Sequence, residues 1–186
     1  MKVSRLVRRG LDGLYLGAGW LAGLFLIAIL LLMLGLSLGR MINVNVRSGD
    51  DFTAWCMAAT AFLGLAYTFK AGDMIRVGLV IDKIGGKARR VIEIVCLLIG
   101  TGFIGFFSFH ACFMVRDSWR FMDMSQGVVA VPLWIPQIGY AAGLCILLVA
   151  FVDELVCVLA GSRPSYVPPP PTSAAEVVER AIQSGV

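Results

Sequence analysis

The chain has 186 residues, of which 59% are hydrophobic and only 15% are charged, whereas soluble domains carry about 25% charged residues. This composition excludes an ordinary soluble domain. The formal net charge of +4 could suit nucleic acid, but the sorting of basic residues along the chain explains it better, and we expect no nucleic-acid partner.

Four long apolar runs each predict a membrane-spanning helix, because about 20 helical residues cross a hydrocarbon core of about 30 Å. The first run is too long for the apolar region of a signal peptide and is followed directly by the second, so we interpret it as an uncleaved helix. The sequence therefore predicts an all-α integral membrane protein. Its four transmembrane helices are expected at 13–39, 52–70, 91–115 and 133–159.

The basic residues predict the orientation of these helices. Twelve of the 16 Lys and Arg residues lie before the first span, from Lys70 at the end of the second span to the start of the third, or after the fourth. Positive charge is retained in the cytoplasm during insertion, so both termini are expected inside. The segments 1–12, 71–90 and 160–186 are then cytoplasmic, and 40–51 and 116–132 are short outer loops.

The first outer loop ends in a helix-start pattern, Ser48-Gly49-Asp50-Asp51. A serine at the N-cap with an acid three residues later predicts a cap, and acids suit the positive end of the helix dipole. Capping alone is the simpler interpretation. The alternative is that Asp50 and Asp51 contact a partner protein on the outer surface.

The 71–90 connection contains a stretch, 74–84, that is too short and too charged to span but apolar enough to need cover. Arg76, Lys83 and Lys87 recur near helical spacing. This pattern predicts an amphipathic helix in the headgroup plane, with its basic edge toward anionic membrane lipids.

The second outer loop, 116–132, leads into the fourth helix. Trp119 and Trp134 are expected at the level of an aromatic belt. Pro132 and Pro136 mark the first turn of the helix, where proline is tolerated. Beyond the fourth helix, the 160–186 tail holds four consecutive prolines and is expected to be extended there.

Charged and polar residues inside the spans are few. Asp153 and Glu154 lie near the inner end of the fourth span, where we expect water or the tail to reach them. The single histidine, His110, is a functional candidate because it is ionisable and lies within a membrane span. A bis-histidine haem site needs two histidines, so a neutral hydrogen-bonding role is favoured for it.

The sequence shows no phosphate-binding loop, paired metal ligands or serine nucleophile motif, so we predict neither an enzyme nor a cofactor. The five cysteines form no C-x-x-C pair and are expected to pack as small apolar residues. Glycines four residues apart predict that the first and fourth helices each pack closely against another element or partner. These pairs are Gly13/Gly17, Gly19/Gly23, Gly35/Gly39 and Gly139/Gly143.

A transporter that binds its own solute has polar groups or broken helices at mid-depth. These spans lack both, so residue chemistry alone points to a membrane subunit of a larger complex.

Three segments carry motifs of one family. Residues 48–52 (SGDDF) resemble an acidic entry to helix two. Residues 62–77 contain FLGLAYTFK and GDMIRV, similar to an F-x-G-x-A-Y-x-x-[RK] helix end followed by an H-I-R-V-D loop. Residues 125–127 (SQG) and 132–137 (PLWIPQ) are similar to a proline- and tryptophan-containing entry to helix four. In this order, over roughly residues 10–160, the chain resembles the small membrane subunit of tripartite ATP-independent periplasmic (TRAP) transporters, the DctQ-like family.

The chain departs from the family pattern at two positions. Met74 stands where the family usually has histidine, and Gly78 where it often has aspartate, whereas Arg76 matches. A role that depends on that histidine or aspartate therefore does not carry over to this chain.

The resemblance implies a scaffold role. In this family the large membrane subunit holds the solute and sodium sites and moves like an elevator, while a periplasmic substrate-binding protein delivers the solute. The small subunit packs beside the fixed part of the large one. The implied solute is an organic acid such as a dicarboxylate or sialic acid, the implied location is the bacterial inner membrane, and no cofactor is expected in this chain. The hypothetical partner or lipid contacts are Asp50, Asp51, Arg116, Asp117, Arg120 and Trp134 at the outer side, and Arg76, Lys83 and Arg90 at the inner interface.

Three alternatives stay open at this point. The chain could be a stand-alone or self-associating four-helix protein, such as a pore or a membrane enzyme, although Thr101, Ser108 and His110 make a poor polar stripe for a pore. It could be the small subunit of a tripartite tricarboxylate transporter, which its operon neighbour would reveal. It could also hold haem as an oxidoreductase subunit, which would give a Soret band.

Overall fold

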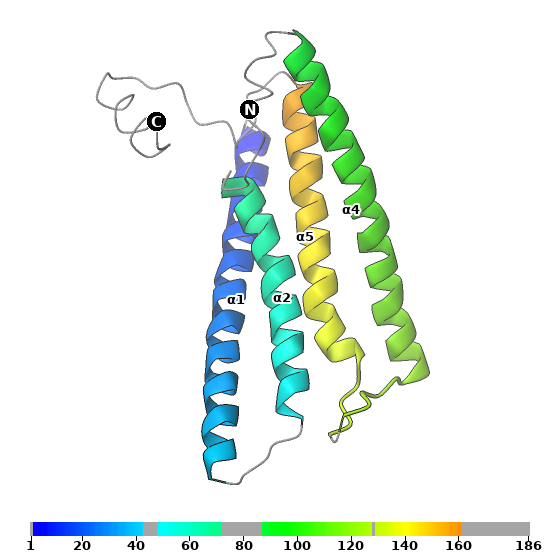
Figure 1. Ribbon diagram of the computed structural model, residues 1–186. Coiled ribbons are helices and arrows are strands. Elements are labelled where there is room, and N and C mark those ends of the chain that lie inside the picture. Colours follow the sequence, from blue (N-terminus) through cyan, green and yellow to red (C-terminus); the bar gives the residue numbers. More distant parts are fainter. Residues whose placement is uncertain (1, 43–47, 72–86, 128, 161–186) are drawn as a thin grey trace, which may run out of the picture.

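The computed structural model describes residues 2–42, 48–71, 87–127 and 129–160. These residues form four helices, α1 (Lys2–Met41), α2 (Gly49–Ala71), α4 (Lys87–Phe121) and α5 (Trp134–Leu159), as Figure 1 shows. Outside the helices, an isolated bridge pairs Met124 with Pro132. Each of the four helices is long and apolar enough to cross a membrane, which confirms the predicted all-helical, four-span architecture.

Several helices extend beyond the apolar runs that predicted them. Helix α1 begins at Lys2 and so includes nearly all of the 1–12 segment, and α4 reaches Phe121 and so includes the start of the expected second outer loop. An apolar run marks the part of a helix that suits hydrocarbon. The backbone hydrogen bonding continues into flanking Lys, Arg and Glu residues, which are good helix formers.

The four helices lie side by side in the order α1, α2, α5, α4 (Figure 1). Helices α2 and α5 are in the middle of this row, and α1 and α4 form its two edges. One end of the bundle, which we call the N-terminal end, holds the start of α1, the end of α2, the start of α4 and the end of α5. The opposite end holds the other four helix termini.

The edge helices contact the middle ones through narrow stripes. On α4 the buried residues Leu97, Ser108 and Ala111 face α5. On α1 the buried residues Ala18 and Ala22 pack against α2. Within each helix these residues lie on one side, as expected for helices that pack nearly parallel. Tyr15 of α1 and Ser118 of α4 are also buried, and the remaining described side chains of the two edge helices are exposed or half-buried.

The two middle helices approach each other closely. A Cβ on Gly143 would lie 2.6 Å from the backbone carbonyl carbon of Phe62, and one on Gly139 would lie 3.0 Å from the Cβ of Ala59. Helix α5 therefore reaches the backbone of α2 at the predicted glycine pair, and this part of the close-packing prediction is confirmed.

The glycines of α1 behave differently. Gly19 packs on the ring of Tyr67, but Gly13, Gly17, Gly23 and Gly35 have open space where a Cβ would be. Within the described residues these four glycines are not packed against another helix, because α1 presents alanines rather than these glycines to α2, so close packing at them stays a prediction about a partner.

Candidate functional sites at the two ends of the bundle

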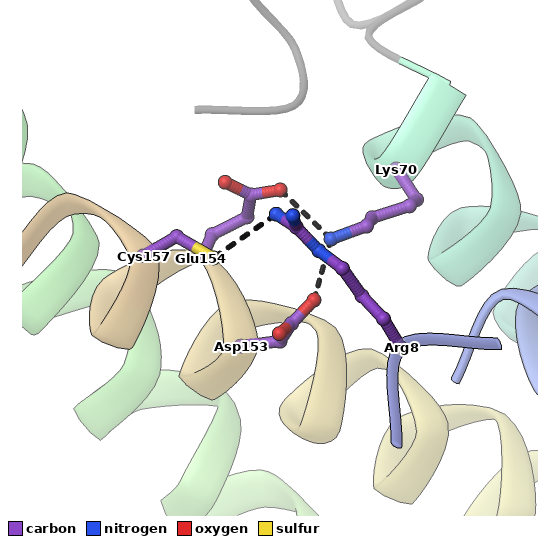
Figure 2. A network of polar contacts seen from close by, with 5 residues as sticks. All are labelled: Arg8, Lys70, Asp153, Glu154 and Cys157. Atoms are coloured by element: carbon purple, nitrogen blue, oxygen red, sulfur yellow. Dashed lines mark hydrogen bonds and ion pairs between the residues drawn. The ribbon is translucent and has the colours of Figure 1, made fainter. Parts of the chain in front are cut away.

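A buried ion cluster joins α2 to α5 at the N-terminal end of the bundle (Figure 2). The ammonium nitrogen of Lys70 lies 2.5 Å from Oδ2 of Asp153 and 3.0 Å from Oε1 of Glu154. The Lys70 and Asp153 side chains are 14% and 16% exposed, and that of Glu154 is fully buried. Water therefore does not reach Glu154, because α5 turns this residue into the bundle; the tail, the other expected contact of the two acids, lies outside the described residues.

Helix direction explains the composition of this cluster. Asp153 and Glu154 lie near the C-terminus of α5, where the negative end of the helix dipole disfavours acids. Lys70 lies in the last turn of α2, where a cation is favoured. Buried carboxylates without a cation are costly, so Lys70 makes the two acids tolerable and ties together the ends of α2 and α5.

Helix α1 reaches the same cluster. The nitrogen of Lys70 lies 5.5 Å from the ring centroid of Tyr15, a cation–π distance. Nη2 of Arg8 lies 3.6 Å from the sulfur of Cys157 on α5, and Figure 2 shows the Arg8 side chain extending toward the acids. Three helices thus meet at one polar site. We call it the Lys70 cluster, consisting of Arg8, Tyr15, Lys70, Asp153, Glu154 and Cys157.

Arg90 connects α4 to α5 at the same end. Its Nη2 donates to the carbonyl oxygens of Val158, at 3.1 Å, and Leu159, at 3.5 Å. The last carbonyls of a helix have no partner within it, and a cation there also suits the helix dipole. Arg90, predicted as a contact at the inner interface, thus caps α5 within its own chain.

At the opposite end, the connection between α4 and α5 is an ordered loop organised around one serine. The Ser125 N–H donates to the carbonyl of Val131 at 2.8 Å. Its hydroxyl donates to the carbonyl of Val129 at 3.0 Å and accepts from the Val131 N–H at 3.2 Å. We call residues 122–133 the Ser125 loop, of which Val128 lies outside the described residues.

The Ser125 loop packs on the start of α2. The Val129 N–H donates to the hydroxyl of Ser48 at 3.0 Å, and Ser48 is buried. Gly127 lies so close to Asp51 that a Cβ on it would collide with the carboxylate. The Ser48 hydroxyl, predicted to cap its own helix, therefore accepts its bond from a different loop, and Asp51 is half-buried against that loop.

Asp50, the other acid of this segment, is exposed. Its Oδ2 lies 3.8 Å from Nη2 of Arg40 at the end of α1. Both side chains are solvent-accessible, and exposed ion pairs contribute little to stability. Asp50 is therefore free to exchange this contact for one with a partner, whereas Asp51 already packs inside the chain.

The remaining contacts predicted for the outer side also lie at the opposite end of the bundle. Arg116, Asp117 and Arg120 are exposed on the last turns of α4. Trp134 is half-buried at the start of α5, edge-to-face against Trp119, with ring centroids 4.7 Å apart. The structure thus gathers Asp50 and these residues at one end of the molecule.

Other predictions fall elsewhere. Arg76, Lys83 and the whole 74–84 stretch predicted as an interfacial helix lie outside the described residues. His110 is exposed on α4, with its ring against Phe106 and Phe109.

The Lys70 cluster was not anticipated, although the sequence carries a signal for it. Lys70 ends the second apolar run, and Asp153 and Glu154 interrupt the fourth just before its end. Charges of opposite sign at matching depth favour a pair when their helices are neighbours. That α2 and α5 are neighbours is known only from the fold.

Comparison with known proteins bears on both sites. Residues 29–161 match the family described as tripartite ATP-independent periplasmic transporters, DctQ component. The matched region includes Lys70, Asp153, Glu154 and the Ser125 loop, whereas Arg8 and Tyr15 precede it. Among curated proteins, the comparison found no match. Because the match covers well over half of the sequence and agrees with the four-span architecture, the chain belongs to the DctQ family, the small membrane component of TRAP transporters.

Proposed function

We propose that this small TRAP component serves as a scaffold that packs against the large membrane subunit and holds its fixed part in place during transport. Family membership carries the proposal. The family is one of transporter components rather than enzymes. The row of four helices supports a scaffold role, since a wide and shallow arrangement leaves extensive apolar surface for a neighbouring subunit.

The Lys70 cluster fits this role. Salt bridges and polar contacts join α1, α2 and α5 at the N-terminal end, and Arg90 joins α4 to α5 there. A scaffold beside a moving domain has to keep its own helices in register. Buried ion pairs are strongly destabilising to break, so this cluster suits a part that stays rigid.

The proposed location is the bacterial inner membrane, with the N-terminal end of the bundle in the cytoplasm. The concentration of Lys and Arg at that end supports this orientation. The Ser125 loop, Asp50 and the charged end of α4 then face the periplasm. Residues 71–90, with Arg76 and Lys83, are proposed to contact lipid headgroups on the cytoplasmic side.

The proposed transport reaction is sodium-coupled uptake of an organic acid such as a dicarboxylate or sialic acid. The sodium and solute sites are assigned to the large subunit, and the substrate-binding protein delivers the solute from the periplasm. This chain would contribute no cofactor and no solute site of its own.

Affinity capture of the tagged chain from its native membrane in mild detergent tests the proposed assembly. We expect a TRAP-type large subunit in equal amount, and solute uptake by proteoliposomes that contain both subunits and are given the binding protein. Omitting this chain should reduce uptake to near background. Recovery of the chain alone, or only with itself, would contradict the proposal, and a large subunit of the tricarboxylate type would favour that alternative.

We also propose that the substrate-binding protein docks on Asp50 and the charged end of α4 at the periplasmic side. Charge reversal tests this docking. Asp50→Lys with Asp117→Lys should weaken its association with the membrane complex about two- to tenfold, and more at low salt, because exposed interface charges act mainly on association rate. Surface plasmon resonance on the reconstituted complex measures this.

Asp12→Lys is the matched control, because Asp12 is an exposed acid at the N-terminal end. It should leave docking unchanged. Loss of the large subunit on reversal of Asp50 and Asp117 would instead mean that these acids hold the membrane complex together.

A further inference from the structure

The side of α4 that faces away from α5 is aromatic. Phe103, Phe106, Phe109 and Phe113 are 66%, 61%, 59% and 41% exposed. The ring of His110 lies among them, with its centroid 4.4 Å from that of Phe106 and 5.7 Å from that of Phe109. We call these five residues the aromatic face.

His110 lies at the depth of the hydrocarbon. It comes six residues before Arg116, the first charged residue at that end of the helix, which corresponds to about 9 Å along the axis. In the other direction the next charged residue is Glu93, much farther away. Ionisable side chains at such depth almost always face protein or a water-filled cavity. Helix α5 covers the opposite side of α4. In the described part of this chain, His110 is therefore surrounded neither by protein nor by a water-filled cavity.

Helix α1, the other edge of the row, makes an informative contrast. Its exposed large residues from Leu14 to Leu38 are leucine, isoleucine and methionine apart from Trp20, and no charged residue or histidine occurs from Gly13 to Gly39. Such a surface suits lipid chains. The aromatic face differs in kind, because aromatic side chains are enriched at protein interfaces and lose little conformational entropy on binding.

We infer that the aromatic face of α4 docks on a membrane-spanning helix of the large subunit, and that His110 forms a hydrogen bond with a polar group of that helix. The inference rests on the proposed function, since it takes the large subunit as partner. The phenyl rings supply packing area. The imidazole fixes the rotation of the two helices, because polar side chains join membrane helices only where a partner lies opposite.

Photo-crosslinking tests the assignment of the face. Benzoylphenylalanine is placed at Phe106 or, as the control, at Leu31, in membranes that contain all three TRAP components. The two positions are matched, since Phe106 is 61% and Leu31 64% exposed, ten residues before Arg116 and nine before Arg40. We expect an adduct with the large subunit from Phe106 and none from Leu31.

Other adducts would overturn the inference. These are a large-subunit adduct from Leu31 but not Phe106, a dimer of this chain from Phe106, or lipid adducts alone at both positions. Capture of the large subunit by the unmodified chain is measured in the same membranes. If that capture is present, a failed crosslink counts against the face alone. If it is absent, the proposed function fails as well.

Substitution of His110 tests the hydrogen bond separately. His110→Leu should lower the affinity for the large subunit about threefold, the average effect of hydrogen bonds between membrane helices, whereas His110→Asn should retain most of it. The melting temperature of the isolated chain should not change, because His110 lies away from α5. Equal affinity of the wild type and His110→Leu would overturn the role of the imidazole.

Discussion

Lys70→Met is expected to destabilise the bundle by about 3–5 kcal/mol, the range found when one partner of a buried ion pair is removed. Asp153 and Glu154 would lose the cation that lies 2.5 and 3.0 Å from them. Two neighbouring buried carboxylates would then repel each other between α2 and α5. The melting temperature of the purified chain in detergent measures the effect, and a large decrease is expected.

The matched control removes all the charges together. The triple variant Lys70→Met, Asp153→Leu and Glu154→Met should recover most of the lost stability, because a buried ion pair replaced by hydrophobic residues of similar volume is often neutral in cost. Asp12→Asn, an exposed acid at the same end, should melt like the wild type. If Lys70→Met also melted like the wild type, the cluster would not be what holds these helix ends together.

Gly143→Ala is expected to force α5 away from α2. The added Cβ would lie 2.6 Å from the carbonyl carbon of Phe62 and 2.8 Å from the backbone nitrogen of Leu63. These are backbone atoms, so no side-chain rotation relieves the clash and the helix itself has to shift. Overpacking of this kind costs about 1–3 kcal/mol, and the melting temperature should fall accordingly.

Gly102→Ala is the control for this substitution. Gly102 lies on α4 with open space where a Cβ would be, so alanine there should be neutral or slightly stabilising through its better helix propensity. Equal losses of stability from both variants would contradict the close α2–α5 contact, since the effect would then follow from glycine replacement in general.

Local features of the sequence were enough to predict the fold class. A run such as Gly13–Gly39 is apolar over a length that matches the hydrocarbon core, and every residue that determines this lies in the run itself. The family resemblance also came from short contiguous motifs, such as the one at 132–137, and the match over residues 29–161 confirms it. The exposed candidates Asp50, Arg116, Asp117 and Arg120 were found because the ends of apolar runs are easy to locate. Their roles remain predictions.

The sequence by itself thus determined that this chain has four membrane helices and belongs among the TRAP small components, because apolar length and motif order are properties of contiguous residues. Only the tertiary structure decided that α5 lies between α2 and α4, that Lys70 pairs with acids more than 80 residues away, and that Ser48 holds the Ser125 loop. Hydrophobicity assigns a helix to the membrane, but it favours every possible neighbouring helix almost equally. The order of helices is instead set by where small residues allow backbones to meet and where buried charges find their partners.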